Sequence, residues 1–106
     1  MEVFMQSLRK KFDAKGSFDL ETKHLTVLKG SKVAEAISEA RTFRGAKSVA
    51  KVRAENTKDN VVINSVEFKS ASTAANFVTG QSTNGMRAWK AEDGAAIGDV
   101  IKNEDN

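Results

Sequence analysis

Four basic residues at helical spacing can bind a polyanion. They are Arg41, Arg44, Lys47 and Lys51. The segment that holds them, residues 41–54, has a fifth cation, Arg53, and no acidic residue. On a helix the four side chains would share an arc of about 120° and could neutralise phosphates. The alternative is a solvated helix face without a partner, since many charged faces are only that.

A second group of candidates surrounds Asn84-Gly85. The predicted binding residues here are Ser72, Gln81, Asn84, Arg87 and Lys90. The loop 81–87 offers amides and a guanidinium that can hydrogen-bond to base edges, and the backbone amides of residues 72–74 can hold a phosphate. The alternative is structural: a tight turn with positive φ at residues 84 and 85, and Trp89 as a core aromatic.

Few residues are suited to catalysis. The chain has one histidine, His24, and no cysteine or tyrosine, and no Ser-His-acid pattern surrounds His24. The acidic residues are scattered, which argues against a carboxylate metal site. The glycines form neither a phosphate-binding loop of the Walker type nor a dinucleotide fingerprint. We therefore expect no catalytic residues, no bound metal and no cofactor.

Length and composition predict one small domain over residues 1–106. The formal net charge is +3, and residues 92–106 carry five acids against Lys102 alone, so a polyanion would be drawn to the middle of the chain. No apolar run is long enough to cross a bilayer, and the charges of residues 1–11 lie on the wrong side for a secretory signal. We expect a cytoplasmic protein without a membrane partner.

The first half of the chain predicts strands followed by a helix. Residues 2–8 suit a strand or a helix, and residues 14–16 suggest a break. Residues 17–20 and 24–28 predict a hairpin. Residues 33–55 favour a helix, most clearly over 39–54. The packing face of that helix would consist of Phe43, Ala46, Val49 and Ala50.

The second half predicts short strands at 61–63 and 66–69, then a helix over 72–79. Ser70 or Ser72 would cap that helix and Gly80 would end it. Residues 87–90 suggest a strand, residues 93–94 a turn, residues 95–101 a helix or strand, and residues 103–106 a frayed end. The predicted fold class is α+β: a small single domain with a mostly antiparallel sheet packed by two or three helices.

Three sequence blocks in a fixed order resemble a known family. They are residues 27–31, 68–80 and 84–90, followed by Asp93-Gly94. The order resembles that of the bacterial domain of unknown function 4357, often appended to GIY-YIG nucleases and other restriction-associated proteins. The resemblance covers about residues 8–101, with Ala71 where the family usually has proline and Met86 where it has an aromatic. It implies a compact α+β module without an established activity, and DNA binding by association with nucleases and methylases.

These observations favour a non-catalytic DNA-binding accessory module of a restriction, mobile-element or phage-related system. A nuclease or a methylase would be its protein partner. Two alternatives stay open. One is a protein-interaction module whose basic stripe docks on an acidic partner surface, because electrostatic attraction is common to both kinds of partner. The other is an uncharacterised structural domain.

Overall fold

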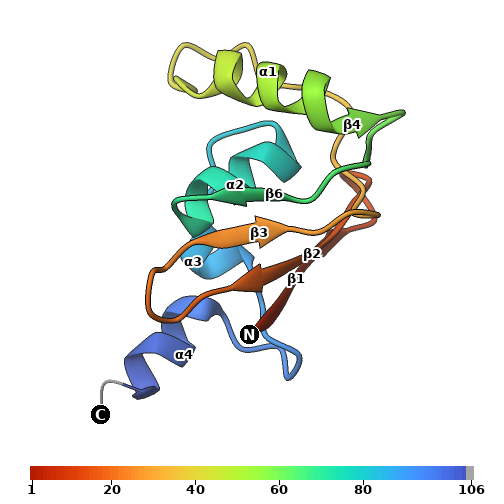
Figure 1. Cartoon of the computed structure of the whole chain (residues 1–106). Coiled ribbons are helices and arrows are strands. Elements are labelled where there is room, and N and C mark those ends of the chain that lie inside the picture. The colour runs from red at the N-terminus through yellow and green to blue at the C-terminus, as the bar shows by residue number, and fades with distance from the viewer. Residues whose placement is uncertain (105–106) are drawn as a thin grey trace.

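A computed structural model describes residues 1–104, with side chains for residues 1–102 (Figure 1). Its centre is an antiparallel four-stranded sheet in the order β1-β2-β3-β6. The strands are β1 (Glu2–Ser7), β2 (Phe12–Phe18), β3 (Leu25–Val27) and β6 (Val66–Phe68). A small hairpin joins β4 (Thr57–Lys58) to β5 (Val61–Val62). The predicted α+β class with a mostly antiparallel sheet is confirmed.

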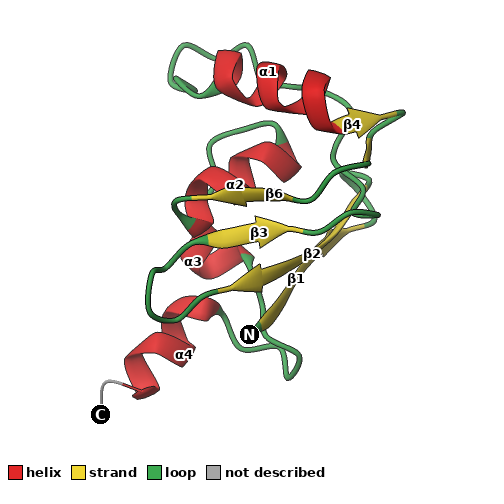
Figure 2. Cartoon of the chain, in the orientation of Figure 1, coloured by secondary structure: helices red, strands yellow, loops and turns green. Residues whose placement is uncertain are grey.

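The described residues form four helices. These are α1 (Ala46–Asn56), α2 (Ala71–Thr79), α3 (Gly85–Ala88) and α4 (Ile97–Glu104). In Figure 2, α2 and α3 lie behind the sheet, α1 lies beyond β6, and α4 lies at the other end of the molecule. None of the described helices combines the length and the apolar character that a membrane crossing requires.

The sheet buries one face and exposes the other. Along β2, Phe12, Ala14, Gly16 and Phe18 are buried, whereas the three residues that alternate with them are exposed, as strand geometry requires. The predicted break at residues 14–16 is wrong, because β2 runs through it. An ideal Cβ on Gly16 would lie 2.8 Å from Leu25 Cδ2, so this glycine makes room for a neighbouring strand.

The predicted helix over residues 39–54 starts too early, because α1 begins only at Ala46. The preceding residues are committed to other partners. The Val33 amide donates to the Asn60 carbonyl and the Ala34 amide donates to the Val78 carbonyl, both at 2.8 Å. Phe43 is buried and anchors the loop that leads into α1. Tertiary contacts therefore override the helix propensity of residues 33–45.

The predicted helix with its two caps is confirmed as α2. Ser70 Oγ accepts a hydrogen bond from the Thr73 amide at 3.1 Å, and Gly80 ends the helix with φ 74°. The predicted strand over residues 87–90 is wrong, because α3 occupies residues 87 and 88 and Lys90 forms only isolated bridges. The tight turn with positive φ is also wrong: Asn84 has φ −78° and caps α3 by accepting from the Met86 amide.

The chain returns to the β1 edge after α3. Phe4 and Lys90 exchange backbone hydrogen bonds of 2.7 and 2.8 Å, and the Ala91 amide donates to the Ala95 carbonyl. This segment thus pairs with the outer edge of β1 at Phe4, and the predicted turn at 93–94 follows, with Gly94 at φ 89°. Residues 95–101 contribute the start of α4. Of the residues predicted to fray, 103 and 104 continue α4, while 105 and 106 lie outside the described residues.

Candidate nucleic-acid interface

Arg53 is a scaffold residue and is not available to a polyanion. It is 7% exposed, and its guanidinium donates to three carbonyl oxygens: those of Phe77 at 3.0 Å, Val78 at 3.3 Å and Glu35 at 3.4 Å. Burial lowers the pKa of Arg53, yet an arginine stays protonated at any pH near neutrality. Only four of the five cations in residues 41–54 can therefore act at the surface.

The position of this guanidinium explains why a buried cation is stable there. Phe77 and Val78 belong to the last turn of α2, whose carbonyl groups carry the negative end of the helix dipole. The hydrogen bonds of Arg53 satisfy these groups and hold α1 on α2. The side chain thus fixes the helix that displays Lys47 and Lys51.

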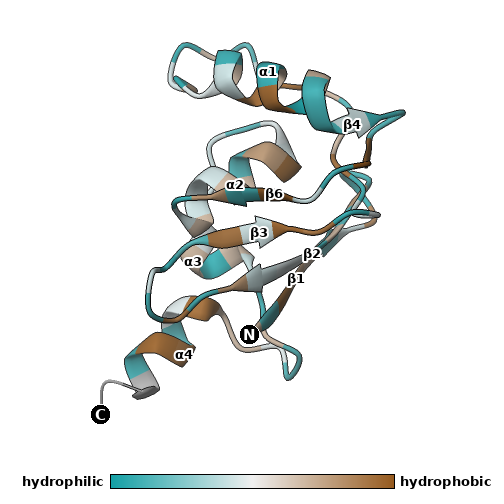
Figure 3. Cartoon of the chain, viewed as in Figure 1, coloured by the Kyte–Doolittle hydropathy of each residue, from teal (hydrophilic) through white to brown (hydrophobic). Residues whose placement is uncertain are grey.

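The other four cations lie around the N-terminal half of α1, but not as the predicted single helical stripe. Arg41 and Arg44 are in the turns before the helix, and Lys47 and Lys51 lie one turn apart on it. All four side chains are exposed, and among the described residues none forms an ion pair. Figure 3 shows α1 as mostly hydrophilic, with one hydrophobic stretch.

The packing face of α1 was predicted in part. Phe43 and Val49 are buried, as expected, but Ala50 is exposed. The N-cap residue of α1 is Gly45, which provides no side-chain hydrogen bond, and the first turn has no acidic residue. The positive end of its dipole therefore lies between Arg44 and Lys47, which is a favourable place for an anion.

The loop between α2 and α3 is held in a defined shape. Asn76 Oδ1 accepts a hydrogen bond from the Thr83 amide at 2.8 Å, and the Thr79 and Thr83 hydroxyl groups are 2.8 Å apart. Gln81 is partly exposed and Asn84 is exposed. Asn84 Oδ1 already accepts the Met86 amide in capping α3, so the amide nitrogen is the donor that Asn84 can offer to a partner.

The start of α2 is already occupied by groups of the chain. Ser70 accepts from the amides of Thr73 at 3.1 Å and Ala74 at 3.2 Å, and Ser72 Oγ accepts from the Gly85 amide at 3.0 Å. Ser72 thus joins α2 to α3. The Ser72 hydroxyl and the amides of Thr73 and Ala74 are therefore already engaged within the chain, which makes residues 72–74 a poor site for the expected phosphate.

Gly85 and Trp89 also lock α3 onto α2. Trp89 is fully buried and its Nε1 donates to the Ala71 carbonyl at 3.1 Å, which confirms the interpretation of Trp89 as a core aromatic. An ideal Cβ on Gly85 would lie 2.1 Å from the Ala71 carbonyl carbon. Glycine is thus required here by close approach and not by positive φ.

The β1–β2 turn contains three cations that the sequence analysis did not assign to the interface. Arg9, Lys10 and Lys11 are exposed, and among the described residues none forms an ion pair. Lys10, Lys11 and Gln81 line one open cavity of about 400 Å³. The run Arg9-Lys10-Lys11 is the signal in the sequence that could have indicated these cations.

Seven of the nine predicted binding residues, all except Ser72 and Asn84, fall into three groups in the structure. The first is the basic cluster Arg41, Arg44, Lys47 and Lys51. The second is Gln81, which lines the same cavity as Lys10 and Lys11 of the β1–β2 turn. Arg87 and Lys90 form the third and share a cavity of about 310 Å³ with Asp99, which weakens their pull on a phosphate. In Figure 1, α2 lies between α1 and α3, so Arg87 is separated from the basic cluster.

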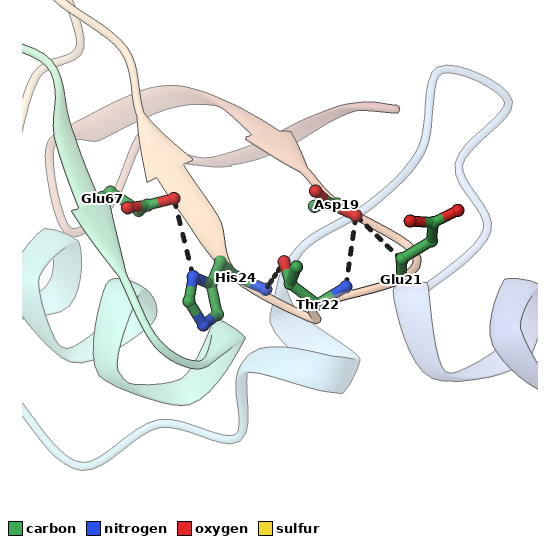
Figure 4. A network of polar contacts seen from close by, with 5 residues as sticks. All are labelled: Asp19, Glu21, Thr22, His24 and Glu67. Atoms are coloured by element: carbon green, nitrogen blue, oxygen red, sulfur yellow. Dashed lines mark hydrogen bonds and ion pairs between the residues drawn. The ribbon is translucent and has the colours of Figure 1, made fainter.

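His24 belongs to a polar network on the open side of the sheet (Figure 4). Its Nδ1 lies 3.5 Å from Glu67 Oε2, and its amide donates to the Thr22 hydroxyl. Asp19 Oδ1 accepts from the amides of Glu21 at 2.8 Å and Thr22 at 3.2 Å, and these bonds hold the pKa of Asp19 below its usual value. Among the described residues no three His, Asp or Glu side chains are grouped so as to hold a metal.

Comparison with known protein families gives a match over most of the chain. A family model described as a domain of unknown function, DUF4357, matches residues 4–101. No curated protein and no solved structure matches the chain.

Proposed function

The chain belongs to the DUF4357 family, to which no function is assigned, and from its own surface we propose that it is a non-catalytic DNA-binding accessory module. The observation that carries the proposal is the basic cluster Arg41, Arg44, Lys47 and Lys51 at the N-terminal half of α1. Four unpaired cations beside an uncapped helix start suit the phosphates of a duplex.

The loop between α2 and α3 supports a second contact. Gln81 presents a side-chain amide beside Lys10 and Lys11, and amides can hydrogen-bond to base edges while lysines hold the flanking phosphates. Arg87, Lys90 and the exposed amide nitrogen of Asn84 are further candidates in the same half of the chain. Affinity would come from the basic cluster and any sequence preference from this loop.

The proposal includes a biological setting. We place the module in a restriction, mobile-element or phage-related system, in the cytoplasm, beside a nuclease or methylase that supplies the chemistry. The support is the resemblance described above, whose family accompanies such enzymes. In this setting the domain contributes DNA affinity to a separate catalytic partner.

A second candidate function is a protein-interaction module that docks an acidic partner. One observation favours it: an apolar cavity of about 280 Å³ lies between α1, α2 and β6, with Val49, Val52 and Phe68 in its lining. The basic cluster lies on the same helix, so an acidic segment with one apolar side chain would suit this place. DNA ranks first because a protein partner would leave the cations of the β1–β2 turn unused.

The test is a titration of labelled duplex DNA at several salt concentrations. The test variant carries Arg41→Gln, Arg44→Gln, Lys47→Gln and Lys51→Gln. Each phosphate contact contributes about −0.9 to the slope of log K against log [salt], so we expect the variant to lose a slope of about 3 to 4 and most of its affinity.

The matched control removes four exposed lysines elsewhere, with Lys29→Gln, Lys32→Gln, Lys58→Gln and Lys69→Gln. It has the same net charge as the test variant, and we expect it to bind nearly as the parent does. Equal losses in the two variants would show that only net charge matters and would contradict the assigned cluster. No binding of the parent at low salt would exclude DNA and favour the acidic protein partner.

A further inference from the structure

The most exposed large apolar side chain lies at the tip of a basic hairpin. We propose that the β1–β2 turn, residues 8–11, inserts Leu8 between base pairs from the minor groove of a duplex while Arg9, Lys10 and Lys11 hold the flanking phosphates. This inference rests on the proposed function and adds a way of bending the DNA.

Leu8 stands apart from the other apolar residues of the surface. Its side chain is 88% exposed, whereas the next most exposed large hydrophobic residue, Ile63, is 44% exposed. A single exposed leucine is ordinary on a protein surface. At Leu8 the next three residues are all cations, and this combination of an apolar tip and phosphate-binding groups is the feature that needs a partner.

The turn presents Leu8 on a rigid support. β1 and β2 pair along their whole length, up to Ser7 opposite Phe12. Ser7 Oγ accepts a hydrogen bond from the Lys10 amide at 3.1 Å, which closes the turn. Val3 and Met5 of β1 are buried in the core below it. Because the backbone of the turn is held before binding, insertion of Leu8 would require little further ordering of the backbone.

The surroundings of the turn favour a nucleic acid over a lipid surface. One leucine is too small an apolar surface to hold a protein at a membrane, but one apolar side chain is enough to unstack a base step and kink the duplex. Gln81 lies beside Lys10 and Lys11 and adds a group that can hydrogen-bond to a base. Glu35 is the one acidic residue that lines this cavity.

The experiment measures bending and binding separately. Energy transfer between dyes at the two ends of a short duplex reports bending, and a salt titration reports phosphate contacts. We expect the parent protein to bring the dyes together at saturation. Leu8→Gln should abolish this change and weaken binding about tenfold while leaving the salt slope unaltered, because it removes no phosphate contact.

Two further variants sharpen the comparison. Ile63→Gln removes the next most exposed large apolar side chain and should leave both bending and affinity as in the parent. The double variant Lys10→Gln, Lys11→Gln should lower the salt slope by about 2, at 0.9 per phosphate. Thermal unfolding of each variant verifies that the fold is intact, which we expect because all the changed residues are exposed.

The failure of this inference differs from the failure of the proposed function. If Leu8→Gln bends DNA as the parent does, the insertion of Leu8 is wrong, while loss of binding in the four-cation variant would still uphold DNA binding. If the parent binds no duplex at low salt, both proposals fail. A third measurement is binding to vesicles with anionic lipids. If Leu8→Gln binds these vesicles less well than the parent but binds and bends DNA as the parent does, the partner of the turn is a membrane and the inference is overturned.

Discussion

Arg53 Nε donates a hydrogen bond of 3.0 Å to the carbonyl oxygen of Phe77. The bond joins the inner face of α1 to the last turn of α2, in a place that water does not reach. A guanidinium offers five donors in a planar fork, so the same side chain also bonds the carbonyl groups of Val78 and Glu35. The placement of the basic cluster depends on this attachment.

Replacing Arg53 with Met should destabilise the domain by about 2 to 4 kcal/mol, because buried carbonyl groups lose their donor. Chemical denaturation followed by circular dichroism measures the change. Lys51→Met on the exposed side of the same helix is the control and should shift stability by about 0.5 kcal/mol or less. Equal effects at the two positions would contradict the structural role of Arg53.

Gly85→Ala should disrupt the contact between α3 and α2. Its Cβ would lie 2.1 Å from backbone carbon and 2.2 Å from backbone oxygen of Ala71, atoms that cannot move aside cheaply. We expect a loss of about 3 kcal/mol or more, as for other severe overpacking. Gly98→Ala is the control: its Cβ would be 3.4 Å from the nearest atom, and alanine favours α4 by up to about 1 kcal/mol. Thermal melts of both variants measure the two effects. A melting temperature of Gly85→Ala equal to that of the parent would contradict the close contact between α3 and α2 at this position.

Trp89→Ala should destabilise the domain strongly, because truncating a fully buried indole costs about 3 to 5 kcal/mol out of the about 5 to 15 kcal/mol typical of a single domain. Trp89→Phe should be milder, at about 1 to 3 kcal/mol, since it keeps an aromatic ring and loses the bond to Ala71. Phe4→Ala, at a half-buried position, serves as the control. Denaturant titration orders the three variants, and a Trp89→Ala protein as stable as the parent would be inconsistent with the core position.

Asp19 should make the stability of the β2–β3 turn depend on pH. The Glu21 and Thr22 amides lower the pKa of Asp19 in the folded state, so the carboxylate stabilises the fold above its unfolded pKa of about 3.9. This contribution is lost as pH falls through the lower folded value. Asp19→Asn keeps an acceptor without the charge, so the parent should melt above this variant at pH 6, and the gap should close below about pH 4.

The control for this pH series is Asp13→Asn, which removes another exposed carboxylate from the same strand region. Melting temperatures of the three proteins are compared from pH 7 down to pH 3. A gap between the parent and Asp19→Asn that stays constant over the whole range would show that the turn does not depend on the ionised carboxylate.

Elements with local signals could be predicted from the sequence. Ser70 and Gly80 are the cap residues of α2 and lie next to the helix in the sequence, and the structure confirms both. The residues around Glu21 likewise indicate the β2–β3 turn. The start of α1 could not be predicted, because the Val33 and Ala34 amides are bonded to residues far along the chain. Helix propensity carries no information about such partners.

The candidate interface also contains features that local sequence signals predict and features that depend on tertiary contacts. The exposure of Arg41, Arg44, Lys47 and Lys51 agrees with the sequence pattern, although their helical arrangement does not. The burial of Arg53 depends on where α2 ends in space, so counting charges along α1 could not reveal it. The cations of the β1–β2 turn were missed because residues 2–8 suited a helix as well as a strand, and the hairpin tip could not be located.

The exchange of hydrogen bonds between Phe4 and Lys90 also affects how the chain is made. During synthesis β1 and β2 emerge early, but the outer edge of β1 stays open until Lys90 has left the ribosome. Open strand edges pair readily with other chains, so this interval is when nascent molecules aggregate most easily. A message that stops before the codon for Lys90 would yield a product that keeps this edge open permanently and becomes a substrate for chaperones and proteases.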